Sequence, residues 1–249
     1  GAGRGGSPPR AAQLIIGEEI LNGSVKDQNI HLMADYCFAN GYDLKRVEVI
    51  PDDVGEIVTT VRRICDNYDI VVSTGGIGPT CDDVTYEAMA EAFGDTCEYH
   101  PLVLQWMEES MGKAKLTKNR MRMARLPTTA EVVRVPGMWV PVAIMGGKVA
   151  VLPGIPSLFE KMLPHAASVW PPGVRLHRFE VFTDKMESDI CDVLLEAQSE
   201  FSPCVLGSYP STSRESPYRV RVSVHSRDED LGRACRNWLS LKLQQVRCE

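Results

Sequence analysis

Short apolar runs alternate with helix-like segments through the first half of the chain, and this alternation restricts the possible folds more than any other feature. Residues 13–17, 44–50 and 68–74 are apolar or β-branched runs, which are typical of strands. Between them, residues 29–40 and 54–67 repeat apolar side chains at helical spacing. Strands and helices that alternate in this way form a parallel sheet with right-handed crossovers. The sequence therefore predicts an α/β fold.

This pattern is interrupted at residues 170–173, which read Trp-Pro-Pro-Gly, and we interpret the interruption as a domain boundary. The later run YRVRVSV alternates in the way typical of a sheet with one face exposed to water. The expected order beyond the boundary is strand, helix, strand, strand and helix, over residues 175–183, 187–201, 205–209, 218–225 and 228–246. We therefore expect an α/β domain over residues 11–169 and a small α+β subdomain over residues 174–249.

Composition and charge exclude several function classes. The 249 residues include 33 Asp and Glu against 27 Lys and Arg, a formal net charge of −6. Because no dense run of Lys and Arg occurs, we expect no nucleic-acid partner. No window approaches the roughly 20 uninterrupted apolar residues of a membrane span, so we expect no membrane association. Residues 1–10 are rich in Gly, Pro and Arg, and we interpret them as a flexible arm or a remnant of expression.

The chain contains 8 cysteines at wide and irregular spacing, and nothing in it resembles a secretory signal. An even number of cysteines can indicate disulfides, but the spacing favours reduced, mostly buried thiols. We therefore expect a cytoplasmic protein.

Unusual residues follow the expected strands, at the positions where each strand ends. In an open parallel sheet, ligands bind outside the carboxyl ends of the strands. The residues that follow the strands form four clusters: Gly17, Glu18, Glu19, Asn22, Gly23 and Asp27; Pro51, Asp52 and Asp53; Thr74, Gly75, Gly76, Gly78, Thr80, Asp82, Asp83 and Thr85; and Pro153, Gly154 and Pro156. We expect these clusters to meet at one edge of the sheet and to form a ligand site.

The third cluster has the composition of a phosphate-binding loop. Gly75, Gly76 and Gly78 allow the backbone to approach a ligand closely and to present N–H groups near a helix N-terminus. Carboxylates beside a phosphate repel it unless a divalent cation lies between them. We therefore expect Asp52, Asp82 and Asp83 to bind a divalent metal ion, Mg²⁺, Mn²⁺ or Co²⁺.

Each of these clusters also has a purely structural interpretation. Asp82 or Asp83, and either member of Asp52–Asp53, precede expected helices and are good N-cap residues. Glu18 and Glu19 are equally consistent with a solvated turn, and Pro153–Gly154 with a simple turn. The occurrence of all four clusters at strand ends favours the ligand site.

Three of the motifs resemble the molybdopterin-binding (MoaB/Mog-like) domain family. They are GEEILNG at residues 17–23 with Asp27 and Asn29, TGGIGPTCDDVT at residues 74–85, and PGIP at residues 153–156. The second motif is most similar to the CinA N-terminal branch and to the first domain of eukaryotic FAD synthases. LGSYP at residues 206–210 and YRV at residues 218–220 are similar to the end of that FAD synthase domain. The resemblance implies a three-layer αβα fold with a mostly parallel sheet.

The resemblance also implies an activity. In the Mog-like members, the positions that match Asp52 and Asp83 serve Mg²⁺-dependent adenylylation of molybdopterin, and in the CinA-like branch the same architecture is associated with metal-dependent hydrolysis of FAD or ADP-ribose. Two positions depart from the family: Glu18 replaces the usual Asp, and Cys81 stands where relatives often have His. We assign no catalytic role to Cys81.

We therefore predict metal-dependent hydrolysis of a dinucleotide pyrophosphate, FAD or ADP-ribose, with Asp52 and Asp83 as catalytic residues. The predicted ligand-binding residues are Gly17, Glu18, Glu19, Gly23, Asp27, Thr74, Gly75, Gly76, Gly78, Thr80, Thr85, Pro153 and Gly154. The alternatives are a non-catalytic domain that binds molybdopterin or a flavin nucleotide, and molybdopterin adenylylation. The chain lacks the further domain with which FAD synthases transfer an adenylyl group, so we do not expect a complete FAD synthase. The resemblance implies a homo-oligomer.

Overall fold

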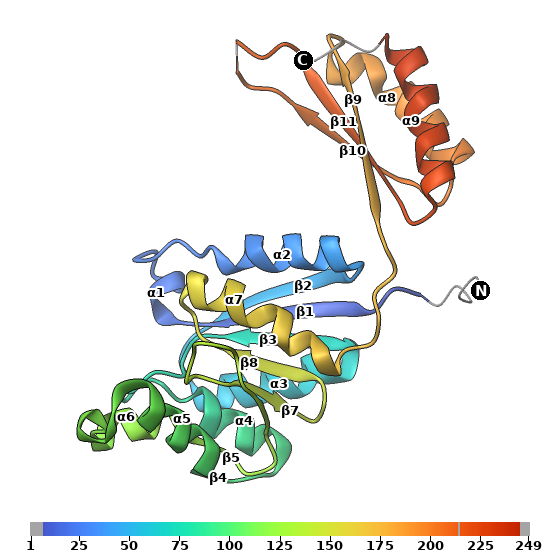
Figure 1. Cartoon of the computed structure of the whole chain (residues 1–249). Coiled ribbons are helices and arrows are strands. Elements are labelled where there is room, and N and C mark those ends of the chain that lie inside the picture. Colours follow the sequence, from blue (N-terminus) through green and yellow to red (C-terminus); the bar gives the residue numbers. More distant parts are fainter. Residues whose placement is uncertain (1–6, 214, 245–249) are drawn as a thin grey trace. The chain divides into compact units, whose positions relative to one another are not determined.

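The alternation of strands and helices is present in the computed structural model, which describes residues 7–213 and 215–244 (Figure 1). The chain divides into two units, and the division lies between Gly173 and Val174. Residues 1–6 of the segment that we interpret as an arm lie outside the described residues. Arg10, at the end of that segment, already belongs to the first strand. The first strand therefore begins one residue before the expected start of the domain, at residue 11.

The first unit is built on a six-stranded sheet. Its strands are β1 (Arg10–Ile16), β2 (Asp43–Ile50), β3 (Ile70–Thr74), β6 (Glu131–Val133), β7 (Val142–Met145) and β8 (Val149–Leu152). Their order in the sheet is β2-β1-β3-β8-β7-β6. The first four are parallel, whereas β7 and β6 are antiparallel to their neighbours. The mostly parallel sheet that the sequence predicts is confirmed.

Helices cover both faces of this sheet (Figure 1). On one face lie α2 (Asn29–Asn40) and α7 (Pro156–Ala166), whose Met33 and Phe159 are fully buried in one core. The other face is covered by α3 (Val54–Asn67), α4 (Thr85–Phe93) and α5 (Pro101–Met111), and Ile57 and Met89 lie in a second core. The three-layer αβα arrangement is therefore confirmed.

Local signals explain why several elements have the predicted bounds. Every side chain of β3 is buried, which agrees with its continuous apolar and β-branched sequence. Helix α2 ends at Gly41, which adopts a left-handed conformation with φ 76° that glycine tolerates best. Helix α3 begins after Asp53, whose side chain accepts a hydrogen bond from the Glu56 N–H.

The segment between α4 and β6 contains short elements that the sequence did not predict individually. These are β4 (Cys97–Tyr99), the 3₁₀ helix η1 (Lys113–Lys115), α6 (Lys118–Arg122) and β5 (Arg125–Pro127). Strands β4 and β5 form a separate antiparallel pair. Each has three residues, too few for a periodic pattern, and α5 and α6 separate them along the chain. The pairing is therefore a product of tertiary structure.

The second unit contains β9 (His177–Thr183), α8 (Glu187–Glu200), β10 (Val205–Pro210), β11 (Val220–Ser226) and α9 (Glu229–Leu243). Its strands form an antiparallel sheet in the order β10-β11-β9. The helices pack on one face, where Val181, Val222 and Leu239 are fully buried. This is the small α+β subdomain that the sequence predicts.

The seven described cysteines are all free thiols, and Cys248 lies outside the described residues. Among the described residues, no helix is both long enough and apolar enough to span a membrane.

Candidate functional site

The loops that follow β1 and β2 are joined by a carboxylate. The chain turns after β1 into α1 (Glu18–Leu21), and the Glu18 N–H donates to Asp52 Oδ2 at 3.0 Å. The Gly17 N–H donates to the Ile50 carbonyl at 3.1 Å. The first and second sequence clusters therefore lie side by side, as expected from the rule that neighbouring parallel strands end at one edge.

The glycine loop after β3, residues 75–80, packs tightly against both of these clusters. A Cβ atom added to Gly75, whose φ is +98°, would lie 2.0 Å from the Ile16 carbonyl oxygen. One added to Gly76, whose φ is +62°, would lie 3.1 Å from Asp52 Oδ1 and 2.3 Å from Thr85 Oγ1. Only glycine has both the left-handed conformation and the small size that these two positions require.

The loop after β8 completes the edge. The Gly75 N–H donates to the Leu152 carbonyl at 3.2 Å, and a Cβ added to Gly154 would lie in ordinary contact with the Gly75 Cα, at 3.4 Å. Asn29, at the start of α2, donates to the Gly154 carbonyl at 2.8 Å. All four clusters are therefore in contact.

A cavity of about 550 Å³ opens at this junction, a size typical of small-molecule sites. Seven of the predicted site residues line it: Glu19, Gly75, Gly76, Gly78, Asp83, Pro153 and Gly154. The rest of its wall is mostly apolar and comes from Val25, Ile77, Pro79, Tyr86, Met123, Trp139, Val140, Ile155, Pro156 and Leu158. We call it the glycine-loop cavity. Backbone polar groups and an apolar wall thus border the same space.

Asp83 organises the glycine loop. Its carboxylate accepts hydrogen bonds from the Gly78 N–H at 2.6 Å and the Thr80 N–H at 2.8 Å, and also from the Thr80 hydroxyl. It does not cap α4, because that helix begins at Thr85 without a side-chain cap. Thr85 also holds the loop, since its hydroxyl donates to the Gly75 carbonyl at 2.9 Å.

The adjacent carboxylates Asp52 and Asp53 have different surroundings. Asp53 caps α3, whereas Asp52 is half-buried at the site and contacts the first loop. Burial raises the pKa of the Asp52 carboxyl above its ordinary value; the hydrogen bond from the Glu18 N–H opposes this, and the negative charges of Glu19, Asp82 and Asp83 add to it. The capping interpretation therefore applies to Asp53, whereas Asp52 remains a candidate site residue.

The predicted metal ligands are not gathered into a preformed cage. Within the part of the chain that the structure describes, no group of three or more His, Cys, Asp or Glu side chains could hold a metal ion. Asp82 is exposed. Both oxygens of Asp83 accept hydrogen bonds from the glycine loop. In the described residues, Asp52 Oδ1 accepts no hydrogen bond.

The remaining predicted site residues support the loops or lie away from the cavity. Gly17 and Thr80 lie in the loops around it, whereas Glu18, Thr74 and Thr85 are end residues of α1, β3 and α4. The Thr74 hydroxyl is buried and has no hydrogen-bond partner among the described residues. By contrast, Asp27 accepts from the Ile30 N–H at 2.8 Å at the start of α2, and Gly23 lies in an open left-handed turn. The predicted site residues that do not line the cavity are Gly17, Glu18, Gly23, Asp27, Asp52, Thr74, Thr80, Asp82 and Thr85.

Sequence reasoning missed the apolar wall. Trp139, Tyr86 and Met123 line the cavity. The sequence around Met123 indicates only a core or contact residue. These side chains come from three separate segments, and no spacing rule connects them. The only available signal was the aromatic and methionine content of segments between the predicted strands.

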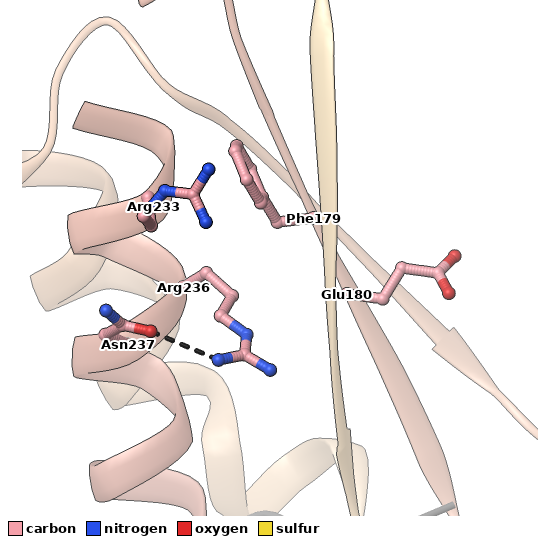
Figure 2. Close-up of a pocket in the computed structure, with 5 residues that line it drawn as sticks. All are labelled: Phe179, Glu180, Arg233, Arg236 and Asn237. Carbon is pink, nitrogen blue, oxygen red and sulfur yellow. Dashed lines mark hydrogen bonds between the residues drawn. The ribbon is translucent and has the colours of Figure 1, made fainter. Parts of the chain in front are cut away.

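The second unit has a separate hollow of about 400 Å³ between β9 and α9 (Figure 2). Its cations are engaged: Arg233 donates to Glu229 at 2.7 Å and lies over the Phe179 ring, and Arg236 donates to Asn237 at 3.1 Å. Glu180 points away from the helix in this view. None of the motifs that predict a ligand site contributes to this hollow.

Comparison with known proteins covers both units. Residues 12–169 match a family model described as a probable molybdopterin binding domain, and residues 175–248 match the FAD synthase middle domain. A protein of Aeropyrum pernix is 34% identical over 237 residues, which cover 91% of this chain and 88% of that protein. A probable FAD synthase of Caenorhabditis elegans is 28% identical over 247 residues, which cover 88% of this chain and 47% of that protein.

Among solved structures, the protein CinA of Thermoplasma acidophilum, of unknown function, superposes with a TM-score of 0.57 at 33% identity. The match covers 61% of this chain and 92% of that one. The family model matches more than half of this chain. The chain therefore belongs to the molybdopterin-binding domain family, is similar to its CinA-like members, and carries after residue 174 a segment similar to the FAD synthase middle domain.

Proposed function

We propose that the first unit binds a compound that carries a planar ring and a pyrophosphate, such as FAD or ADP-ribose, and hydrolyses the pyrophosphate with the help of a divalent metal ion. One observation carries this proposal: the glycine loop and an apolar, aromatic wall border the same cavity of about 550 Å³. Backbone N–H groups favour an anion, and an aromatic wall favours a flat ring. A dinucleotide contains both groups in one molecule.

The donor set fits a metal ion that arrives with its substrate. Mg²⁺ in nucleotide enzymes is typically held by one or two carboxylates together with phosphate oxygens and water, so a preformed cage is not required. Asp52 is half-buried beside Gly76, and its Oδ1 accepts no hydrogen bond in the described residues. We therefore assign the metal contact to Asp52 and a loop-organising role to Asp83.

In the proposed reaction, an oxygen of water attacks one phosphorus of the pyrophosphate. The bond from that phosphorus to the bridging oxygen breaks, and two phosphate monoesters are released, one of them AMP. The metal ion supplies charge neutralisation and Lewis acidity when it is bound. The N–H groups of Gly76 and Ile77 bind the phosphate, because those of Gly75, Gly78 and Thr80 already donate within the protein, and Asp52 orients the water. The wall formed by Tyr86 and Trp139 holds the ring and excludes solvent from it.

Binding without chemistry is a second candidate, and a specific observation favours it. Asp83 already uses both oxygens to hold the glycine loop, so that Glu19 in the cavity wall and Asp52 beside Gly76 are the carboxylates that remain for a ligand or metal ion. A pterin or flavin nucleotide would fit the same combination of loop and apolar wall. Adenylylation of molybdopterin is a third candidate, which the relatives' domain description supports.

The test is to incubate the purified protein with FAD or ADP-ribose, with and without Mg²⁺, Mn²⁺ or Co²⁺, and to quantify AMP by chromatography. We expect AMP formation that requires metal and falls about a hundredfold in Asp52→Asn. This substitution keeps an oxygen that accepts from the Glu18 N–H but removes the charge. Asp53→Asn is the matched control, because asparagine also caps helices well and should leave the rate unchanged.

Three results would separate the candidates. Metal-dependent AMP release that is equal in the wild type and in Asp52→Asn would exclude the role assigned to Asp52. Tight binding of FAD, ADP-ribose or molybdopterin without any AMP would establish the binding domain instead. Accumulation of adenylylated molybdopterin in the presence of ATP would favour adenylylation.

We also propose that the protein forms a homo-oligomer, as the resemblance implies. Sedimentation at micromolar concentration should give a mass that is a multiple of 27.6 kDa. A single monomeric species would contradict this proposal.

A further inference from the structure

A half-buried arginine lies next to the glycine-loop cavity. Arg122 is the last residue of α6, and it lines a narrow crevice together with Gly76, Gly78 and Asp83. The next residue, Met123, lines both the crevice and the cavity. The crevice is therefore a side branch of the cavity, on the side where the glycine loop presents its backbone.

Arg122 differs from neighbouring arginines in having no partner. Among the described residues, its guanidinium makes no hydrogen bond and no ion pair. Arg120, two positions earlier, donates to the Lys115 carbonyl at 2.8 Å. Arg125 donates to the Cys97 carbonyl at 3.3 Å and lies 3.5 Å from the Glu87 carboxylate. The other two arginines of this segment therefore have partners within the protein, and Arg122 does not.

The two acids of the crevice are already engaged by other groups. Glu87 pairs with Arg125, and Asp83 accepts the N–H groups of Gly78 and Thr80. A half-buried cation without a partner loses hydration and gains no compensating contact. The flat guanidinium presents donors in a fork that matches two oxygens of one phosphate. The crevice itself, of about 10 Å³, has room for no more than a water molecule. An anion that supplies the missing contact would therefore lie in the adjoining glycine-loop cavity, at the border that Gly76, Gly78 and Met123 share with the crevice.

We propose that Arg122 binds a phosphate of the ligand, opposite the N–H groups of the glycine loop. The proposal deepens the function proposed above, because it rests on a phosphorylated ligand in the glycine-loop cavity. Arg122 then makes the cavity selective for compounds with phosphate over the same rings without it. The role is one of binding and positioning, and it requires no particular reaction.

The experiment is calorimetric titration of the full chain with ADP-ribose, inorganic pyrophosphate and adenosine. In Arg122→Gln, the affinity for ADP-ribose and pyrophosphate should fall about tenfold or more, whereas the affinity for adenosine should stay the same. Arg122→Lys should restore part of the affinity, because it keeps the charge but loses the fork. Arg120→Gln is the matched control and should bind all three compounds as the wild type does.

The probes distinguish failure of this inference from failure of the proposed function. Pyrophosphate binding that depends on Arg122, without release of AMP from any dinucleotide, would support the inference and reject the hydrolysis. Metal-dependent AMP release with equal pyrophosphate affinity in Arg122→Gln would support the hydrolysis and overturn the inference. A wild type that binds none of the phosphorylated probes would overturn both. Thermal unfolding of each variant verifies that the fold is retained.

Discussion

At the residue scale, neighbouring carboxylates in this chain have different tasks. Asp53 holds the first turn of α3, and Asp52, one position earlier, accepts from the Glu18 N–H in the loop after β1. Asp53→Ala should lower the free energy of unfolding by about 1 kcal/mol, because the Glu56 N–H loses its acceptor. Urea denaturation measures this change, and ADP-ribose binding should be unaffected. A stability equal to that of the wild type would show that the cap contributes nothing.

Two glycines with left-handed backbone, Gly23 and Gly75, allow the cost of backbone strain to be measured separately from the cost of steric overlap when each is replaced by alanine. A methyl group at Gly23 meets no atom within 4 Å, so Gly23→Ala should cost about 1 kcal/mol, from conformational strain alone. At Gly75 the same group would lie 2.0 Å from the Ile16 carbonyl oxygen. Gly75→Ala must therefore move the loop, and we expect both lower stability than in Gly23→Ala and loss of ADP-ribose binding. Equal effects of the two substitutions on unfolding and binding would contradict this interpretation of the loop.

At the scale of elements, Asp95 fastens the end of α4 to the turn after β5. Its carboxylate accepts from the Thr129 N–H and hydroxyl, each at 2.8 Å, and from the Thr128 hydroxyl. These hydrogen bonds hold the pKa of Asp95 well below its ordinary value, and the one from the Thr128 side chain contributes most. The ionised form therefore stabilises the folded protein above the unfolded pKa, and this stabilisation is lost as the pH falls toward the folded pKa.

Asp95→Asn should consequently be less stable than the wild type at pH 7, and the difference should shrink below about pH 4. Urea denaturation at a series of pH values measures it. Asp66→Asn is the control, because Asp66 is exposed on α3 and makes no side-chain hydrogen bond among the described residues. Its stability difference from the wild type should not change between pH 7 and pH 4. A difference between Asp95→Asn and the wild type that stays constant down to pH 2 would exclude the mechanism.

At the scale of the whole molecule, each unit has its own core, and the candidate site lies within the first unit. We therefore expect two transitions in scanning calorimetry. Leu163→Ala in α7 and Leu239→Ala in α9 remove fully packed side chains from different cores, each at a cost of about 2–5 kcal/mol. Each substitution should lower one transition only.

ADP-ribose should raise the transition that Leu163→Ala lowers, because a ligand stabilises the unit to which it binds. The same ligand should leave the transition that Leu239→Ala lowers unchanged. A single transition that responds to both substitutions would show that the units unfold together.

The sequence by itself determined the type and order of the main elements. Helices α2 and α3 match their expected bounds, because apolar spacing, the Gly41 stop and the Asp53 cap act within a few residues. The convergence of the four strand-end clusters was predictable as well. Once the strands are parallel, their carboxyl ends share one edge.

Only the tertiary structure decided which residues line the cavity and which support it from outside. Asp52 and Asp53 have the same chemistry in the sequence, and their roles separate because only Asp52 meets the loop after β1. Trp139 and Arg122 reach the cavity and its crevice from distant segments that have no shared spacing. Local preferences along the chain are readable from neighbouring residues, whereas contacts between distant segments depend on how the whole unit packs. That difference is why the glycine loop could be predicted and the wall and the arginine around it could not.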